Sequence, residues 1–207
     1  SSPVQVGALT TWSKVVGAST SVVAIKTDGT LWTWGRNNRG ELGQGDSGDP
    51  TNRSSPVQVG ALTTWVQVGG GEQASYAIKA DGTLWAWGNN TFGRLGDSTT
   101  IDKSSPIQVG ALTNWRELGC GSASASATKT DGTVWMWGYN ALGQLGQGNT
   151  TNYSSPVQVG ALTTWARVET GLHTIGVKTD GTLYAWGYNG AGQLGDGTII
   201  RKSSPVQ

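Results

Sequence analysis

The segment Ser-Ser-Pro-Val-Gln-Val-Gly-Ala-Leu-Thr, or a close copy of it, recurs along this chain of 207 residues. Its Ser-Ser-Pro triplet begins at Ser1, Ser54, Ser104, Ser154 and Ser203, so the intervals are 53, 50, 50 and 49 residues. A period of this length indicates an array of structural repeats, because each unit buries its apolar surface only by stacking on its neighbours. We predict one array over residues 1–207, with units at 1–53, 54–103, 104–153 and 154–202 and a partial fifth unit at 203–207.

Each unit has the pattern of short strands joined by tight turns. In the second unit, residues 65–68, 74–79 and 84–88 are predicted strands, and a fourth covers residues 56–59, with Pro56 at its start where no ladder donor is lost. An Asp-Gly pair between two strand segments predicts a hairpin, because Gly adopts the positive φ that the turn requires. This pair occurs in every unit, at Asp28-Gly29, Asp81-Gly82, Asp131-Gly132 and Asp180-Gly181.

The chain lacks segments with helical periodicity and capping residues, so we predict almost no helix. Four short strands that recur about every 50 residues are typical of a β-propeller blade. The predicted fold class is therefore all-β, with four blades of four antiparallel strands that form a partial ring or a ring completed by further repeats or another chain. An open arc would expose apolar sheet faces at both ends.

Tryptophan recurs at fixed places in the units. Two rings separated by one residue face the same side of the returning strand, and a further ring precedes the second strand of each unit. An aromatic binding surface and packing between blades would both use such rings, but identical placement in every unit favours packing. We assign this structural role to Trp12, Trp32, Trp34, Trp65, Trp85, Trp87, Trp115, Trp135, Trp137, Trp165 and Trp186.

Charge and composition restrict the classes of partner. The net charge is +1 and only 13% of residues are charged, with no basic stripe, so nucleic acid and anionic membranes are not favoured. No apolar run is long enough for a membrane helix. The single cysteine, Cys120, excludes disulfides within the chain. The low charge and the many Gly, Ser, Thr and Asn residues favour an extracellular or particle-surface setting.

The run Gly-Thr-Leu-Trp-Thr-Trp-Gly-Arg-Asn-Asn-Arg-Gly-Glu-Leu-Gly at residues 29–43 resembles the repeat of the regulator of chromosome condensation family, and residues 137–146 and 186–195 resemble it closely. The resemblance covers essentially the whole chain. It implies a propeller of four-stranded blades, usually seven in a closed ring. This chain has four units, so we expect a fragment of a longer array or an assembly that completes the ring. The partial unit 203–207 marks a cut within the array or a strand that latches onto the first blade.

The residues that catalysis requires are scarce. His173 is the only histidine, so zinc sites of several His or Cys ligands are excluded, and no nucleophile elbow or phosphate-binding loop is present. The insertion at residues 46–50 carries two carboxylates but lacks a full set of calcium ligands. We predict that the protein is not an enzyme and has no catalytic residue, cofactor or metal.

Partner binding is predicted in the segments that vary between units, because the recurring segments are occupied by packing. One variable segment follows each Trp-Gly pair, and the other precedes each Ser-Ser-Pro triplet. Arg and aromatic residues are common anchors of interfaces. The candidates of these types are Arg36, Arg39, Arg53, Phe92, Arg94, Tyr139, Tyr153 and Tyr188. Sequence variation without function in solvent-exposed loops would also account for these residues.

The leading hypothesis is a non-enzymatic scaffold that binds a protein or a surface glycan through these loops, as a structural or adhesive component of a bacterial or phage surface. Similar repeats in such surface proteins support this setting. The alternatives are an inhibitor or regulator of a partner enzyme and, less favoured, a guanine-nucleotide exchange factor. The founding family member uses a large insertion for exchange, whereas all units here span 49 to 53 residues.

Overall fold

A computed structural model describes residues 2–8 and 10–207, so Ser1 of the first repeat lies outside the described residues. Sixteen strands form four sheets, each of four antiparallel strands that follow one another in sequence. The strands of the first two sheets are β1 (Trp12–Gly17), β2 (Ser21–Lys26), β3 (Leu31–Gly35), β4 (Arg53–Gln58), β5 (Trp65–Gly70), β6 (Ala74–Lys79), β7 (Leu84–Gly88) and β8 (Lys103–Gln108). Those of the other two are β9 (Trp115–Cys120), β10 (Ser124–Lys129), β11 (Val134–Gly138), β12 (Tyr153–Gln158), β13 (Trp165–Thr170), β14 (His173–Lys178), β15 (Leu183–Gly187) and β16 (Lys202–Val206).

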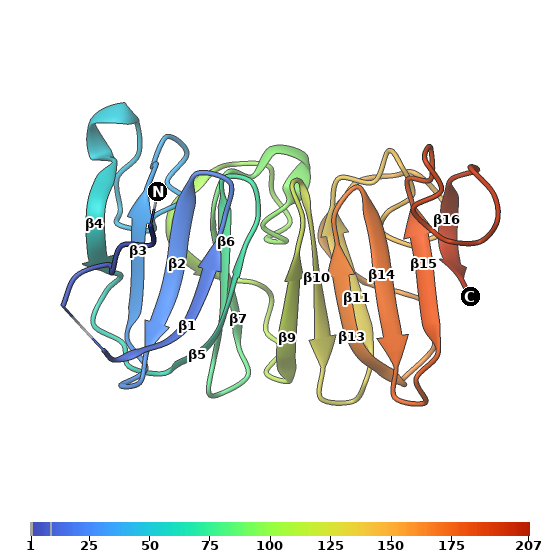
Figure 1. Ribbon diagram of the computed structural model, residues 1–207, viewed down its shortest axis with the longest axis horizontal. Helices are drawn as coiled ribbons and strands as arrows, with labels where there is room; N and C mark the ends of the chain where they lie inside the picture. The colour runs from blue at the N-terminus through green and yellow to red at the C-terminus, as the bar shows by residue number, and fades with distance from the viewer. Residues whose placement is uncertain (1, 9) are drawn as a thin grey trace.

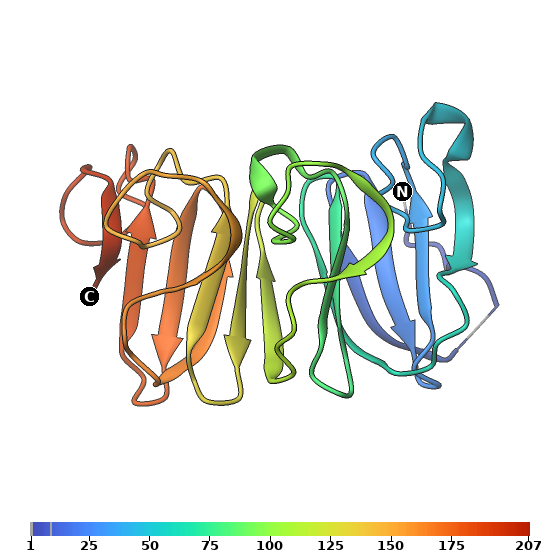
Figure 2. The same cartoon turned by 180° about the vertical axis from the view of Figure 1, so that it is seen from behind.

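The prediction of propeller blades with four antiparallel strands is confirmed. Blades 1 to 4 (β1–β4, β5–β8, β9–β12 and β13–β16) stand side by side in chain order, with the two termini at opposite ends of the row (Figure 1). The view from behind shows the same row (Figure 2). The described helical structure is limited to two short 3-10 turns, η1 (Asp49–Thr51) and η2 (Thr91–Gly93). None of the described helices is long and apolar enough to cross a membrane.

Each blade is offset by one strand from the sequence repeat. The outermost strand of a blade is the Ser-Ser-Pro segment of the following repeat, as in β4, β8 and β12. The segment at residues 203–207 accordingly contributes β16, which pairs with β15 of its own blade through Ala185↔Val206 and Gly187↔Lys202. This segment therefore completes blade 4 and does not pair with blade 1.

The placement of Pro56 differs from the prediction. Pro56 is the fourth of six residues in β4 and not its first residue. A proline in mid-strand is tolerated because β4 is an edge strand, and its register with β3 is irregular between Thr33 and Gly35.

The first strand of each blade lies on the inner side of the arc. β1, β5, β9 and β13 contact one another in succession, whereas β4, β8, β12 and β16 form the outer edges of their sheets. The four sheets do not close into a ring within the described residues. The arc therefore has an inner concave surface and two open ends.

Three apolar cores lie between consecutive blades, and each is built in the same way. Between blades 1 and 2, Trp65 and Trp87 of blade 2 pack with Ile25 and Leu31 of blade 1. We call the contact between two consecutive blades a joint. The side of a blade that carries the two tryptophans is its tryptophan face, and the opposite side, which packs on the tryptophans of the next blade, is its receiving face. The other two joints repeat this arrangement, with Trp115 and Trp137 between blades 2 and 3 and with Trp165 and Trp186 between blades 3 and 4. These six rings are buried between blades.

Candidate functional site

The variable segments lie together at one end of the blades. The loops β3–β4, β7–β8, β11–β12 and β15–β16 form the upper edge of the molecule in Figure 1, and the Asp-Gly turns lie at the lower edge. We call the upper edge the loop face. It is the surface on which the sequence places the eight candidate residues for partner binding.

One asparagine in each unit holds the loop that precedes the outer strand. In blade 2, Asn90 is fully buried, and its Oδ1 accepts a hydrogen bond from the Leu95 amide at 3.0 Å. Its Nδ2 donates to Asp97, Thr99 and the Ile101 carbonyl. Asn37, Asn140 and Asn189 occupy the same position in the other blades and make the same bond to the following leucine. The sequence reading missed these residues, although their recurrence after each Trp-Gly pair is a visible signal.

Phe92 and Tyr139 form an aromatic pair on the loop face between blades 2 and 3. Their ring centroids are 4.9 Å apart, and Phe92 is 42% exposed. The backbone of Phe92 has φ of 65°, a conformation that costs a residue with a side chain about 1–3 kcal/mol. The three other residues at this loop position are Arg39, Leu142 and Ala191, and all of them have negative φ. Strained backbone of this kind is concentrated at functional sites.

Arg94 follows Phe92 by two residues in the same loop and is buried. Its Nε donates to the Thr91 carbonyl at 3.1 Å, and its Nη1 donates to the carbonyls of Glu72 and Ser122 at 2.8 and 3.0 Å. Burial lowers the pKa of the guanidinium from its usual value. These bonds connect the loop of blade 2 with the β9–β10 turn of blade 3. Arg94 therefore anchors the loop that carries Phe92, and its guanidinium is already engaged within the chain.

The other candidate arginines differ in their surroundings. Arg39 is exposed, and its Nη1 lies 3.2 Å from Asp102 Oδ2 across the joint between blades 1 and 2. Arg53 binds its own loop, because its Nη2 lies 2.6 Å from Asp46 Oδ2 and its Nη1 donates to the Thr51 carbonyl. Arg36 is exposed in the loop that follows β3. Arg36 and Arg39 thus present charge to solvent, whereas Arg53 is largely committed to holding its loop.

The remaining two candidates are tyrosines of blades 3 and 4. Tyr153 begins β12, packs on the core between blades 3 and 4, and accepts a hydrogen bond from Asn149 Nδ2 at 3.0 Å. Tyr188 follows β15 and is half-buried. The structure brings Phe92, Arg94 and Tyr139 together, with Arg39 on the neighbouring loop, and leaves Arg36, Arg53, Tyr153 and Tyr188 in separate places.

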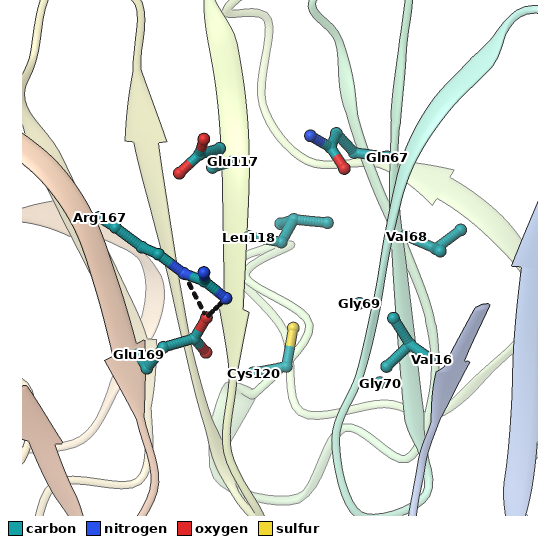
Figure 3. Close-up of a pocket in the computed structure, with 10 residues that line it drawn as sticks. All are labelled: Val16, Gln67, Val68, Gly69, Gly70, Glu117, Leu118, Cys120, Arg167 and Glu169. Carbon is teal, nitrogen blue, oxygen red and sulfur yellow. Dashed lines mark hydrogen bonds and ion pairs between the residues drawn. The ribbon is translucent and has the colours of Figure 1, made fainter. Parts of the chain in front are cut away.

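A second candidate site is the inner concave surface of the arc. An open pocket of about 400 Å³ lies between the inner strands, and Figure 3 shows Glu117, Cys120, Arg167 and Glu169 among its lining residues. Arg167 Nη2 lies 2.8 Å from Glu169 Oε1, so these two charges neutralise each other. Burial raises the pKa of the Cys120 thiol, which opposes formation of the nucleophilic thiolate. The lining residues include no histidine, so this surface lacks a nucleophile paired with a base.

Among residues 2–8 and 10–207, no group of three or more His, Cys, Asp and Glu side chains is placed to hold a metal ion. His173 is half-buried at the start of β14, and its carbonyl accepts the Gly171 amide at 2.8 Å. In the insertion at residues 46–50, Asp46 is paired with Arg53.

The Asp-Gly turns at the opposite edge form a repeated local structure. Asp81 Oδ1 accepts the Thr83 hydroxyl at 2.6 Å and the Thr83 amide at 2.9 Å, and Thr83 Oγ1 accepts the Trp85 indole at 2.9 Å. The hydroxyl bond is the main cause of the lowered pKa of Asp81. The same bonds from threonine to aspartate recur at Asp28, Asp131 and Asp180. The same bonds therefore close all four turns.

Comparison with known proteins gives a consistent match. The family model described as "Regulator of chromosome condensation (RCC1) repeat" matches residues 28–78, 81–127, 131–174 and 180–207. Human E3 ubiquitin-protein ligase HERC2 is 38% identical over 82 residues, which are 38% of this chain and 2% of that protein.

Two solved structures are similar over nearly the whole chain. Human WBSCR16 superposes with a TM-score of 0.82 at 25% identity, over 94% of this chain and 52% of that chain. Prp20p from Saccharomyces cerevisiae, whose structure was described with its binding properties to Gsp1p and histones, superposes with a TM-score of 0.82 at 18% identity. That match covers 94% of this chain and 50% of Prp20p. The chain thus spans about half the length of these solved relatives and a small part of HERC2.

Proposed function

This chain belongs to the regulator of chromosome condensation repeat family, and on that premise we propose that it is a non-enzymatic β-propeller scaffold that binds a protein partner through Phe92 and Tyr139 on its loop face. The observation that carries the proposal is the exposed aromatic pair with a strained backbone at Phe92. Aromatic anchors of this kind dominate the binding energy of protein interfaces. The binding properties described for Prp20p support a protein as the class of partner.

The pair is held in place before any partner binds. Gly93, which follows Phe92, packs so closely on blade 3 that a Cβ atom there would lie 2.4 Å from Ser154 Cα. Arg94 ties the same loop to the carbonyls of Glu72 and Ser122. A rigid anchor loses little conformational entropy on binding, so this arrangement favours affinity.

The finer parts of the proposal concern setting and partner. We place the scaffold on a cell or particle surface, which is supported by the low fraction of charged residues, 13%. A regulator of a partner enzyme would bind through the same aromatic pair. That alternative therefore differs from the surface scaffold in the class of partner and not in the surface that binds it. A surface glycan is the competing ligand. The open ends of the arc are a further part of the proposal, because a second array would complete the ring there.

The test compares wild type with Phe92→Gly and Tyr139→Ala in binding to immobilised surface proteins of the native cell and, separately, to a glycan array. We expect each variant to lose at least about tenfold in affinity for a protein partner. Phe92→Gly should leave the unfolding midpoint unchanged or raised, because glycine adopts φ of 65° without strain.

The matched control is Ile199→Gly, which removes an exposed apolar side chain from another loop of the same face. It should bind like wild type. Unchanged protein binding by both aromatic variants would contradict the loop-face proposal. Binding to the glycan array alone, lost in Phe92→Gly, would contradict the choice of a protein partner.

A further inference from the structure

The two open ends of the array carry the two halves of one blade joint. Blade 1 presents a tryptophan face with no blade before it, and blade 4 presents a receiving face with no blade after it in the described chain. Blade 1 carries Trp12, Val15 and Trp34 where blade 2 carries Trp65, Val68 and Trp87. Blade 4 carries Val177 and Leu183 where blade 1 carries Ile25 and Leu31.

The described residues leave both of these faces exposed. Val15 is 64% exposed, whereas Val68 and Val168, at the same position in internal joints, are 8% and 4% exposed. Leu183 is 60% exposed, whereas Leu31 and Leu84 are fully buried. The two ends therefore carry the same types of residue as an internal joint, but no neighbouring blade covers them within the described residues.

Blade 4 has glycines at the positions where the other blades use glycine to admit the next blade. Gly43, Gly96 and Gly146 each lie against the indole of the next blade, and a Cβ atom on them would lie 2.8 or 2.9 Å from Nε1 of Trp87, Trp137 and Trp186, respectively. Gly195 has the same positive φ, 68°, but nothing lies within 4 Å of its Cβ position. Gly181 and Gly192 of blade 4 are likewise free of neighbours, whereas their counterparts in blades 1 to 3 pack on the following blade.

The hydrogen bonds of the joints also have free counterparts at the ends. The indole Nε1 of Trp87 donates to the Glu41 carbonyl at 2.9 Å, and the two other internal joints repeat this bond at 2.8 Å. By position, the matching donor is Trp34 of blade 1 and the matching acceptor is the Gln193 carbonyl of blade 4. Neither makes this bond within the part of the chain that the structure describes.

We propose that a second copy of this array docks head to tail, so that the tryptophan face of one copy fills the receiving face of the other and the two arcs close into one ring. The proposal deepens the proposed scaffold function and rests on it, because it names the partner of the open ends. The three internal joints show that a tryptophan face and a receiving face of these types fit each other. Two copies supply eight blades, one more than the seven that the family resemblance implies and within the range of about four to eight that is typical of β-propellers.

A head-to-tail pair related by a two-fold axis forms both joints at once, so neither apolar face remains exposed. A single joint would leave one of each face open and allow further addition. This difference makes the mass of the assembly a direct readout. The mass of one chain is 21.5 kDa, and the closed pair has twice that mass.

The test is analytical ultracentrifugation of wild type, Trp34→Glu and Leu183→Glu from about 1 to about 100 µM. Wild type should approach twice the mass of one chain as concentration rises. Each variant should remain at 21.5 kDa, because it buries a carboxylate in both joints of the ring. An equal mixture of the two variants should form one-to-one pairs through a single joint, in which the intact tryptophan face of Leu183→Glu fills the intact receiving face of Trp34→Glu, while the second joint holds both carboxylates and stays open. The matched control is Ile101→Glu, which places the same charge on an exposed isoleucine of the β7–β8 loop and should pair like wild type.

A wild type that stays at 21.5 kDa throughout would overturn the proposal and assign the end faces to other blades of the same polypeptide. Pairing retained by Leu183→Glu, or its absence from the mixture, would overturn head-to-tail docking. A ladder of larger species would overturn ring closure. The proposed function is tested apart from this: Leu183→Glu keeps the loop face and should still bind the partner, and Phe92→Gly should still pair.

Discussion

The internal joints and the open ends of this molecule contain the same residue types at the same positions, yet their burial is opposite. Trp87 is fully buried between blades 1 and 2, whereas Trp34 at the open edge is only half-buried. Leu84 and Leu183 differ in the same way. The comparison teaches that a blade does not bury its own tryptophans. The preceding blade buries them, so stability in this array resides largely in the joints.

The largest expected effect comes from removing one indole from a joint and its counterpart from the open edge. Trp137→Ala leaves a cavity between blades 2 and 3 and removes one of the two donors to the Arg94 carbonyl, which keeps the Tyr76 hydroxyl, so we expect a loss of about 3–5 kcal/mol in the free energy of unfolding. Trp34→Ala should cost less than about 2 kcal/mol, because its ring is only half-buried at the open edge. Urea unfolding in dilute solution measures both. Equal losses would break the comparison.

A smaller effect is expected from a methyl group added to equivalent glycines. Gly96→Ala and Gly195→Ala both place alanine at positive φ, which costs about 1 kcal/mol in each case. In Gly96→Ala the new Cβ also meets Trp137 Nε1 at 2.9 Å, so we expect a further loss of about 1–3 kcal/mol. The difference between the two unfolding midpoints isolates the contribution of the neighbouring blade. Equal unfolding midpoints for the two variants would show that the neighbouring blade does not restrict the Gly96 position.

The smallest effect concerns pH and should not distinguish joints from ends. Hydrogen bonds from threonine lower the pKa of Asp81 and of Asp180 in the folded state, so at acidic pH the unfolded chain binds more protons at these residues. Their contribution to stability is present above the unfolded pKa, near 4, and is lost as pH falls through the folded pKa. Asp81→Asn and Asp180→Asn should each make the loss of stability between about pH 5 and pH 3 slightly shallower, and by similar amounts.

Urea midpoints measured across that range are the readout for the pH prediction. Asp81 belongs to a turn that packs on blade 3, because a Cβ atom on Gly82 would lie 2.0 Å from the Thr113 carbonyl oxygen. Asp180 belongs to a turn at the open end. A steeper pH dependence for one of the two would show that the turn is coupled to its joint.

Most of the fold could be predicted from the sequence, because repetition makes each local pattern visible four times. The strands, the Asp-Gly hairpins and the packing role of the tryptophans follow from periodicity in this way. The offset of the blade from the repeat could not be predicted. A Ser-Ser-Pro segment that pairs with the strands before it has the same spacing as one that pairs with the strands after it. Only the observed strand pairings, such as β4 with β3 and β16 with β15, distinguish the two arrangements.

The candidate site was less predictable than the fold, because it depends on contacts between units. Arg94 is charged and lies in a variable loop, yet it is buried where the other blades carry Glu41, Gln144 and Gln193. The stacking of Phe92 on Tyr139 joins two blades, and the positive φ of Phe92 has no signature in its own residue type. The choice of these two as partner anchors stays a prediction.

The near-identity of the Ser-Ser-Pro segments, each of which closes one blade and leads into the next, has a consequence for how such a gene can change. Unequal crossing-over between two of these segments deletes or duplicates one whole period, wherever within the segment the exchange occurs. The product always has intact blades, and every new boundary again places an indole pair against an apolar sheet. Array length can therefore drift by single units during evolution without a non-folding intermediate.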